Sequence, residues 1–366
     1  MAYTTIDDPS AHFQVAPTWT GGTSAKTLTN DGNSDLQPDL VWIKCRNASQ
    51  PHSITDSSRG TSKSLTAAGT AAEVDDSRFT SFNTDGFTLA GSSGPVNTSG
   101  GEYVGWQWKA NGGSTSSVSE SGSGDGGINA CTYQANTTAG FSIIKYTGHR
   151  GSGIGDNNHT NVTHGLSSAP TFVIIKNLTT GHTLDWQVMG NNLGGFSNYH
   201  LHLNTTAARS GATYVANTAP SSDYVFVGNN NDVNYDGLEF IMYAWHEVQG
   251  YSKFGSYEGN GDANGTFVYT GFKPAWLVVK GIDSTGAWYI VDNRRNLYNL
   301  TDLHIPTNNE GGESSSSSGL HVDLLSNGFK LRTNYTDTNE AGETFTYAAF
   351  AEQPFVTSGG VPATAR

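Results

Sequence analysis

The sequence has few cysteines, few positive charges and no long apolar run. Its 366 residues include only two cysteines, Cys45 and Cys131, which excludes a disulfide framework and predicts two free thiols. Lysine and arginine together number 19, against 32 aspartates and glutamates, and the net charge of −13 argues against nucleic acid as a partner. No run approaches the roughly 18 apolar residues that a membrane span requires, so we expect no membrane insertion.

The residues that are abundant favour strands and turns. The chain has 45 glycines, 11% aromatic residues and many serines, threonines and asparagines. Short apolar runs alternate with clusters of glycine, asparagine, aspartate and serine, and no stretch shows helical periodicity with caps. We therefore predict an all-β fold with a helical content below about a quarter.

One apolar run occurs three times. The segments PDLVWIKC (38–45), PTFVIIKN (170–177) and PAWLVVKG (274–281) each begin with proline and have a lysine six positions later. Upstream of each run lies an aromatic residue followed by any residue and a glycine. These upstream motifs are Trp19-Thr20-Gly21, Tyr146-Thr147-Gly148 and Tyr257-Glu258-Gly259. The repeat predicts three related units.

A third landmark follows each run. Counting from Gly100, Gly237 and Gly342, an aromatic residue occurs at +3 and again at +8. An aromatic residue kept in all three units is typical of a core position, so we predict that the +8 residues Trp108, Trp245 and Phe350 are buried. Trp106, at +6, is predicted to lie in the core or at an interface.

The spacing between units exceeds 100 residues, which is the size of a domain and not of a solenoid repeat. We predict three tandem antiparallel β-sandwiches of jelly-roll or lectin-like type. The predicted boundaries are 1–109 for the first repeat, 110–139 for a Gly/Ser-rich linker, 140–250 for the second repeat, 251–356 for the third and 357–366 for a C-terminal tail. The short joint between the second and third repeats predicts a rigid pair.

The segment DVNYDG resembles the start of a calcium loop. Asp232, Asn234 and Asp236 alternate as oxygen ligands do in such a loop, and a glycine follows, but Tyr243 stands where the loop would have its bidentate glutamate. The alternative is a plain hairpin turn before the last strand of the unit. Calcium is the one cofactor that this pattern suggests.

Two histidines form a second candidate metal site. His200 and His202, in NYHLHL, are two positions apart and would share one face of a strand, where both imidazoles can reach one ion. The alternative is a pair of surface histidines. The second unit also lacks the Asp-x-x-Arg motif found at Asp56 and Asp292, so a specialised site is expected there first.

Aromatic residues in loops are candidates for sugar binding. Tyr235, Tyr298 and Tyr335 lie outside the repeat pattern and are candidate glycan contacts, with isolated exposed rings as the alternative. Loop lengths differ most at 148–165 and 308–319, so we expect recognition there. The motifs of the common hydrolases and phosphate-binding loops are absent, and we expect no enzymatic activity.

The pattern of the repeat is similar to a known repeat domain. The proline–apolar–lysine run, the later Asp-x-x-Arg, the [ND]-G-F-x-L segments at 85–89 and 327–331 and the closing YAAFAEQPFV resemble a domain of unassigned function in virion proteins of marine tailed phages, including cyanophages. The resemblance covers nearly the whole chain and carries no catalytic residues.

This resemblance implies a non-enzymatic structural protein on the exterior of the virion. We expect a tail fibre or spike component that binds the host surface, with other virion proteins and host-envelope glycan as partners and a homo-oligomer, preferably a trimer, as the assembly. A capsid decoration or head-fibre protein is the alternative within the same class. A polysaccharide depolymerase is the alternative from another class.

Overall fold

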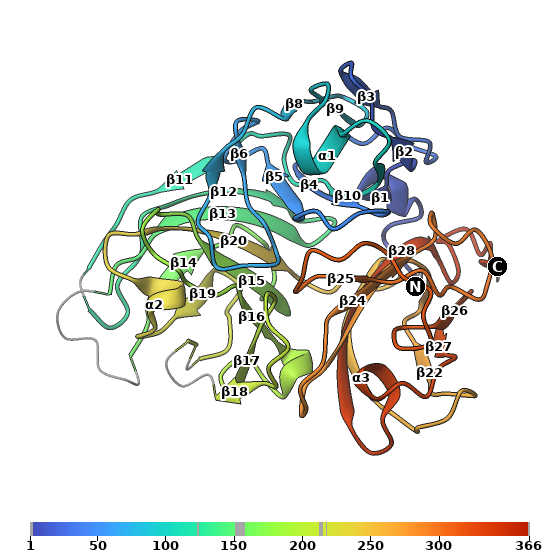
Figure 1. Ribbon diagram of the computed structural model, residues 1–366. Coiled ribbons are helices and arrows are strands. Elements are labelled where there is room, and N and C mark those ends of the chain that lie inside the picture. Colours follow the sequence, from blue (N-terminus) through green and yellow to red (C-terminus); the bar gives the residue numbers. More distant parts are fainter. Residues whose placement is uncertain (1–2, 123, 151–157, 212–214, 217, 365–366) are drawn as a thin grey trace.

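The three repeats lie around a common centre. The computed structural model describes residues 3–122, 124–150, 158–211, 215–216 and 218–364. It is 39% strand and 5% helix, which confirms the all-β prediction. We call residues 13–108 unit 1, 116–245 unit 2 and 252–354 unit 3. In Figure 1 unit 1 is blue and lies at the top, unit 2 is green to yellow and unit 3 is orange to red.

Unit 1 consists of a main sheet in the order β1-β10-β4-β5, with β2 beside β10, and a smaller covering sheet in the order β3-β9-β8. The short strands β6 and β7 pair separately. The elements are η1 (Pro9–Ala11), β1 (Phe13–Val15), β2 (Trp19–Thr20), β3 (Lys26–Leu28), β4 (Leu40–Cys45), β5 (Ser53–Asp56), β6 (Lys63–Ser64), β7 (Val74–Asp75), β8 (Phe79–Phe82), β9 (Phe87–Leu89), α1 (Gly94–Asn97) and β10 (Glu102–Trp108).

Unit 2 has the largest sheet, in the order β11-β12-β13-β20-β15-β16-β17-β18, covered by the pair β14-β19. Its elements are β11 (Ser116–Val118), β12 (Cys131–Asn136), β13 (Phe141–Thr147), β14 (Thr160–Thr163), β15 (Phe172–Asn177), β16 (Gln187–Gly190), η2 (Asn191–Leu193), β17 (Tyr199–His202), β18 (Ser210–Gly211), β19 (Tyr224–Val227), α2 (Asn231–Asn234) and β20 (Glu239–Trp245). Strands β11 and β12 come from the segment predicted as a linker, so that segment belongs to this sheet.

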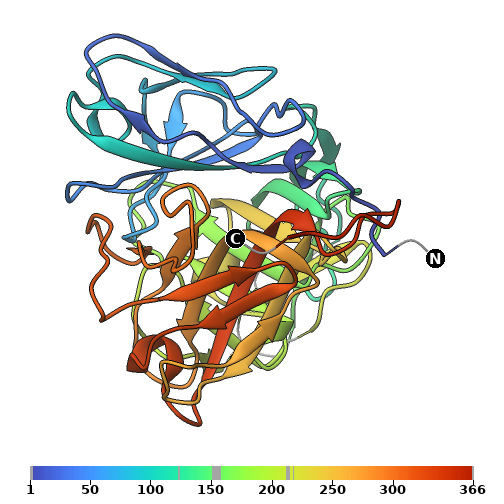
Figure 2. The same cartoon turned by 90° about the vertical axis from the view of Figure 1, so that its right-hand side faces the viewer.

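Unit 3 has a main sheet in the order β21-β28-β23-β24-β25 and a covering sheet in the order β22-β27-β26. Its elements are β21 (Ser252–Glu258), β22 (Phe267–Tyr269), β23 (Phe272–Gly281), β24 (Tyr289–Asp292), β25 (Ile305–Pro306), β26 (Val322–Leu325), β27 (Gly328–Leu331), α3 (Thr336–Asn339) and β28 (Thr344–Pro354). From the side, unit 1 lies above the other two (Figure 2).

The three main sheets share one strand order. In each, the last strand of the unit pairs on one side with β1, β13 or β21 and on the other side with the proline-led strand, which in turn pairs with the strand that follows it. The aromatic residue of each upstream motif stacks on the +3 aromatic residue of the closing strand. These pairs are Trp19–Tyr103 at 5.4 Å, Tyr146–Phe240 at 5.2 Å and Tyr257–Phe345 at 5.2 Å. The repeat is therefore structural.

The proline-led strands are buried on both faces. In β15, Val173 and Ile175 face the covering sheet of unit 2, whereas Phe172 and Ile174 face a central core that all three units share. Strands β4 and β23 alternate in the same way. Because side chains alternate along a strand, a sheet covered on both faces requires a continuous apolar run. The central core also buries Trp108, Trp245 and Phe350, as predicted.

Three equivalent hydrogen bonds close the units into a ring. Trp186 of unit 2 donates its Nε1–H to the carbonyl oxygen of Thr66 in unit 1 at 2.9 Å, and Trp288 of unit 3 donates to His202 O in unit 2 at 2.9 Å. In unit 1 the equivalent residue is His52, whose Nε2 lies 3.0 Å from Pro306 O of unit 3. Since His52 Nδ1 accepts from Trp42, its Nε2 carries the proton and donates.

A loop from each unit continues this contact into the next unit. The carbonyl oxygen of Thr70 accepts from Lys176 Nζ in unit 2, that of Thr206 accepts from Gly286 N in unit 3, and that of Glu310 accepts from Lys44 Nζ in unit 1. Glu310 belongs to the loop 308–319, which was predicted to be a recognition loop. Its residue Glu313 also pairs with Arg46 of unit 1 at 2.8 Å, so part of this loop is an inter-unit contact.

The lysine of each proline-led strand is buried without a carboxylate partner at hydrogen-bonding distance. Lys44, Lys176 and Lys280 are fully buried, and their Nζ atoms donate to backbone carbonyl oxygens. Burial lowers the pKa of each of the three ammonium groups to about 8. The repeated lysine is thus a structural residue, which contacts the neighbouring unit in the case of Lys44 and Lys176 and stays within unit 3 in the case of Lys280.

The Asp-x-x-Arg motifs form ion pairs, and both pairs are buried. Asp56 Oδ2 lies 2.5 Å from Arg59 Nε, and Asp292 Oδ2 lies 2.6 Å from Arg295 Nε, with all four side chains inaccessible to solvent or nearly so. Each aspartate also accepts a hydrogen bond from the +6 residue of another unit. Tyr243 of unit 2 donates to Asp56, and Trp106 of unit 1 donates to Asp292.

Candidate functional site

A cluster of potential metal ligands lies at the edge of the main sheet of unit 2. Asp185 precedes β16, His202 ends β17, and Asp232 lies in α2. Gln187 and His202 are register partners in the antiparallel pair β16–β17, which brings the first two residues together, and α2 places the third beside them. One ligand atom from each of the three side chains lies within 4.8 Å of the others.

Hydrogen bonds hold the two carboxylates in place. Asp185 accepts from Asn204 Nδ2 at 2.7 Å, and its second oxygen lies 3.7 Å from His202 Nδ1. Asp232 accepts from the backbone N–H of Asp185 at 3.2 Å and from Gln187 Nε2 at 2.9 Å. Burial raises the pKa of Asp232, and the nearby Asp185 carboxylate contributes to the increase. The cluster thus concentrates negative charge in a partly buried position.

The two histidines of the predicted pair have different surroundings. His200 and His202 lie on one face of β17, with ring centroids 5.2 Å apart. His200 is buried and His202 is partly exposed. Burial lowers the pKa of His200 to about 4, so its imidazole is neutral at physiological pH. His202 is the member of the pair that faces the two carboxylates.

The calcium-loop prediction is wrong in its geometry, because its three residues do not converge on one point. Asp232 faces Asp185 and His202, whereas the Asn234 side chain is fully buried and accepts from the backbone N–H of His149 at 3.0 Å. Asp236 is exposed. The plain-hairpin alternative is also incomplete, since the segment contains the helix α2.

Asn234 instead belongs to a fourth landmark of the repeat. Asn97 and Asn339 occupy the same position, three residues before the glycine, and each accepts from the backbone N–H that follows the upstream aromatic-x-glycine motif. The sequence contains this signal as Asn-x-x-Gly in all three units. Comparison of the units would have identified Asn234 as structural.

The three candidate sugar-binding tyrosines have different surroundings. Tyr298 is 77% exposed, in the loop after the Asp-x-x-Arg motif of unit 3. Tyr235 packs against His182 with ring centroids 5.2 Å apart, and Tyr335 packs against Tyr289 at 6.3 Å. Only Tyr298 of these three presents a free ring to solvent.

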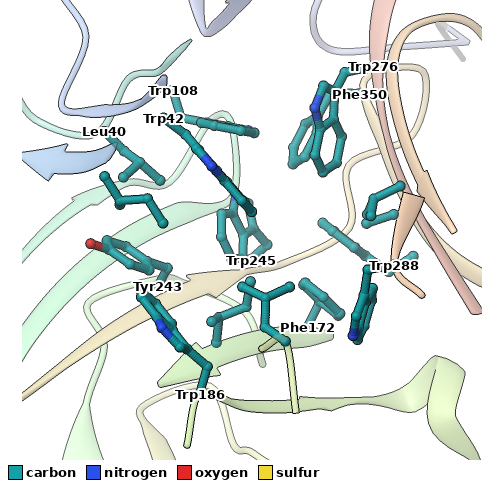
Figure 3. Close-up of a pocket in the computed structure, with 16 residues that line it drawn as sticks. Leu40, Trp42, Trp108, Phe172, Trp186, Tyr243, Trp245, Trp276, Trp288 and Phe350 are labelled. Carbon is teal, nitrogen blue, oxygen red and sulfur yellow. The ribbon is translucent and has the colours of Figure 1, made fainter. Parts of the chain in front are cut away.

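The centre of the molecule contains a small apolar cavity. Its volume is about 40 Å³, and residues from all three units line it, among them Trp42, Trp245 and Trp288 (Figure 3). The lining is entirely apolar, so the cavity offers no polar group to orient a ligand. We interpret it as an imperfection of packing where three sheets meet.

Sequence reasoning missed one member of the metal-ligand cluster, Asp185, and its neighbour Gln187. Asp185 and Gln187 belong to no motif, and they come near Asp232 only through the placement of α2. Of the predicted metal residues, the structure brings together His202 and Asp232, which the sequence had assigned to two separate sites. The loop 148–165 lies partly outside the described residues, at 151–157.

Comparison with known proteins identifies a family and no activity. No curated protein and no solved structure matches the chain. Among the described residues, no helix combines the length and the apolar character needed to cross a membrane. One family model, described as a domain of unknown function (DUF7483), matches residues 8–354 and spans all three units as one domain. The chain therefore belongs to the DUF7483 family.

Proposed function

We propose that this protein is a non-enzymatic virion structural protein of a tailed phage, displayed on the particle exterior as a tail fibre or spike component that binds the host surface. The observation that carries the proposal is the ring of three equivalent units around one aromatic core. Such a body is a rigid scaffold whose peripheral loops can vary without disturbing the core. Resemblance of the repeat pattern to phage virion proteins supplies the setting.

We propose further that each unit is a variant of one sandwich, in which the main sheet packs on its covering sheet. The three sandwiches share a central core, which gives their loops fixed relative positions. Repetition within one chain favours multivalent binding, because weak contacts by linked sites add through a high effective concentration. A homotrimer of the chain would multiply this effect again.

The exposed loop of unit 3 is the best candidate for contact with a glycan or a protein. Leu297, Tyr298 and Leu300 are 63%, 77% and 40% exposed. The loop is held from within, since the side chain of Asn299 donates to Leu324 O at 3.0 Å and accepts from Leu324 N at 2.9 Å. A pre-positioned aromatic ring loses little entropy on binding, which suits stacking against a sugar.

The experiment measures both binding and cleavage. Purified protein is incubated with host cells and with their isolated surface polysaccharide, and retention and new reducing ends are quantified. We expect retention without cleavage, and weaker retention for Tyr298→Ala than for the control Phe267→Ala, which removes an exposed aromatic ring from β22.

Each other outcome contradicts part of the proposal. New reducing ends would identify a depolymerase. Binding to phage heads that lack tails, without retention on cells, would identify a capsid decoration or head-fibre protein. Equal retention of the two variants would exclude the loop of Tyr298 as the contact site.

A further inference from the structure

We propose that Asp185, His202 and Asp232 of unit 2 bind one divalent transition-metal ion of the zinc class. The ligands would be one imidazole nitrogen and carboxylate oxygens, with atoms of the three side chains already within 4.8 Å of one another. This site is independent of the proposed role in host binding.

The repeat separates the structural residues of this cluster from the added ones. Asp232 corresponds to Asp337 of unit 3, and both carboxylates accept a backbone N–H at 3.2 Å, from Asp185 and from Ala287. By strand register, Asp185 corresponds to Ala287 and His202 to Pro306. Unit 3 therefore has one carboxylate here, unit 1 has Pro95 at the same position, and unit 2 adds a second carboxylate and an imidazole that unit 3 does without.

The added carboxylate of Asp185 repels that of Asp232, and a bound cation would neutralise this repulsion. Two carboxylates in a partly buried site repel each other, and like charges this close favour uptake of a proton or a cation. Within the described residues, neither Asp185 nor Asp232 has an ion pair with lysine or arginine. Asp185 instead contacts His202, with 3.7 Å between Oδ2 and Nδ1. The neighbouring Lys176 donates to the carbonyl oxygens of Thr70 and Leu184 instead.

Two buried side chains at the cluster have lone pairs without a hydrogen-bond partner. Gln187 is fully buried, and while its Nε2 donates to Asp232, its Oε1 has no partner. His200, 8% exposed, has an unpartnered Nδ1 and packs its ring against His202. The buried ammonium group of Lys176 interacts electrostatically with both carboxylates but forms its hydrogen bonds with carbonyl oxygens. Because buried polar atoms are almost always paired, the two unpaired atoms are consistent with a further ligand at the cluster.

The donor set selects the class of metal. Calcium takes six to eight oxygen ligands and rarely a nitrogen, whereas zinc and related ions favour imidazole with carboxylate. His202 and Asp185 have side chains that are 23% and 31% exposed, which leaves a route for the ion from solvent. The structure thus favours zinc-class ions over the calcium that the sequence pattern suggested.

The ligands are also attached to both junctions of unit 2. The backbone oxygen of His202 accepts from Trp288 of unit 3, and Trp186, next to Asp185, donates to Thr66 of unit 1. An ion that joins β17, α2 and the segment before β16 would therefore stabilise the ring of units. Since the ion binds only the folded state, it should raise the melting temperature.

The test uses the full chain stripped with a chelator. Zn²⁺, Co²⁺ and Ca²⁺ are titrated separately by calorimetry, and melting temperature is followed with and without each ion. We expect one Zn²⁺ per chain, a Co²⁺ absorption spectrum typical of nitrogen and oxygen ligands, and weaker binding of Ca²⁺.

Each variant introduces the residue type that stands at the equivalent position of another unit. Asp185→Ala installs the residue of unit 3, and His202→Thr installs Thr66 of unit 1. Each should weaken Zn²⁺ binding at least about tenfold, the loss typical even of an outer-shell change. The matched control Asp337→Asn in unit 3 should leave binding unchanged, and circular dichroism verifies that each variant is folded.

Several results would overturn the proposal. These are an absence of stoichiometric Zn²⁺ or Co²⁺ binding by the stripped protein, tighter binding of Ca²⁺ than of Zn²⁺, and Zn²⁺ affinity that the Asp185 and His202 variants do not change. Should both variants fail to fold, Asp232→Asn, which keeps an oxygen to accept the N–H of Asp185, supplies the same comparison.

Discussion

Units 1 and 3 contain a buried aspartate–arginine pair, and unit 2 has Gly190 and Leu193 at the same positions. Whether a unit has this ion pair depends on the +6 residue of the neighbouring unit. Asp56 and Asp292 each accept a hydrogen bond from a +6 side chain, Tyr243 or Trp106, whereas the remaining +6 residue, Ala348, has no donor. A buried aspartate facing alanine would lack that partner. Side chains at the junctions are therefore matched across units, and each unit can diverge only together with its neighbour.

Unit 2 has a different contact with its neighbour at this junction. Asn192, two positions after Gly190, donates to Thr346 Oγ1 of unit 3 at 2.6 Å, which supplies a neutral contact where the other units have charge. The same unit carries Asp185 and His202, which have no equivalent in unit 3. The comparison shows that core residues are the same kind in all three units, whereas residues at the edge of the main sheet differ between units.

The largest expected effect comes from breaking one buried ion pair. Asp292→Ala leaves Arg295 charged and buried, with the more distant Glu313 at 3.7 Å as its remaining carboxylate, and removes the acceptor of Trp106. We expect a loss of about 3 to 5 kcal/mol in the free energy of unfolding, measured with urea. The double variant Asp292→Gly with Arg295→Leu, which copies unit 2, should lose less. A larger loss for the double variant would show that the matching rule does not apply.

The second prediction concerns the +8 position, which is aromatic in all three units. Truncating Trp245 to alanine removes a 5%-exposed ring that contacts Phe141, Phe172 and Phe254. We expect a cost of roughly 3 to 5 kcal/mol in chemical denaturation. Trp108→Ala and Phe350→Ala should cost similar amounts. A value below about 1 kcal/mol for one of them would mean that the units do not share the central core equally.

The third prediction uses the lysines that all three units keep. Their pKa of about 8 in the folded protein lies below the unfolded value of about 10.4, so between these values the unfolded chain binds more protons. Stability should therefore rise as pH increases from 8 to 10. The rise should be on the order of 2 kcal/mol per lysine, and it should end near pH 10, where buried tyrosines with raised pKa begin to oppose it.

Substitution identifies the groups responsible for this pH dependence. Lys44→Met, Lys176→Met and Lys280→Met should each reduce the slope by a similar amount if the units are equivalent. Urea denaturation at a series of pH values gives the slopes. Stability that is flat or falls over this range would contradict the prediction.

The smallest effect concerns the ring of inter-unit hydrogen bonds. Trp288→Phe keeps most of the buried ring and removes the Nε1–H that His202 O accepts. The cost should be about 1 to 2 kcal/mol, the range of one buried hydrogen bond with its unpaired acceptor. Trp186→Phe should match it. Different costs would show that the two junctions are not energetically equivalent, and thermal denaturation of both variants measures this.

The sequence by itself determined the repeat and the residues that serve it. Proline-led runs, aromatic pairs and the +8 core residues were all visible because a residue kept for burial recurs at a fixed distance from its turn. The same logic would have recovered Asn97, Asn234 and Asn339. The residues that recur between units are those that form and cover the sheets within each unit.

Only the tertiary structure decided how the units meet. Trp186 and Thr66 are 120 positions apart, and the three ligands of the candidate metal site come from the segment before β16, from β17 and from α2. No local pattern encodes such contacts, because they depend on three sheets packing at once around one core. The same reason explains the Asp-x-x-Arg motif, whose exposure could not be judged until another unit was seen to cover it.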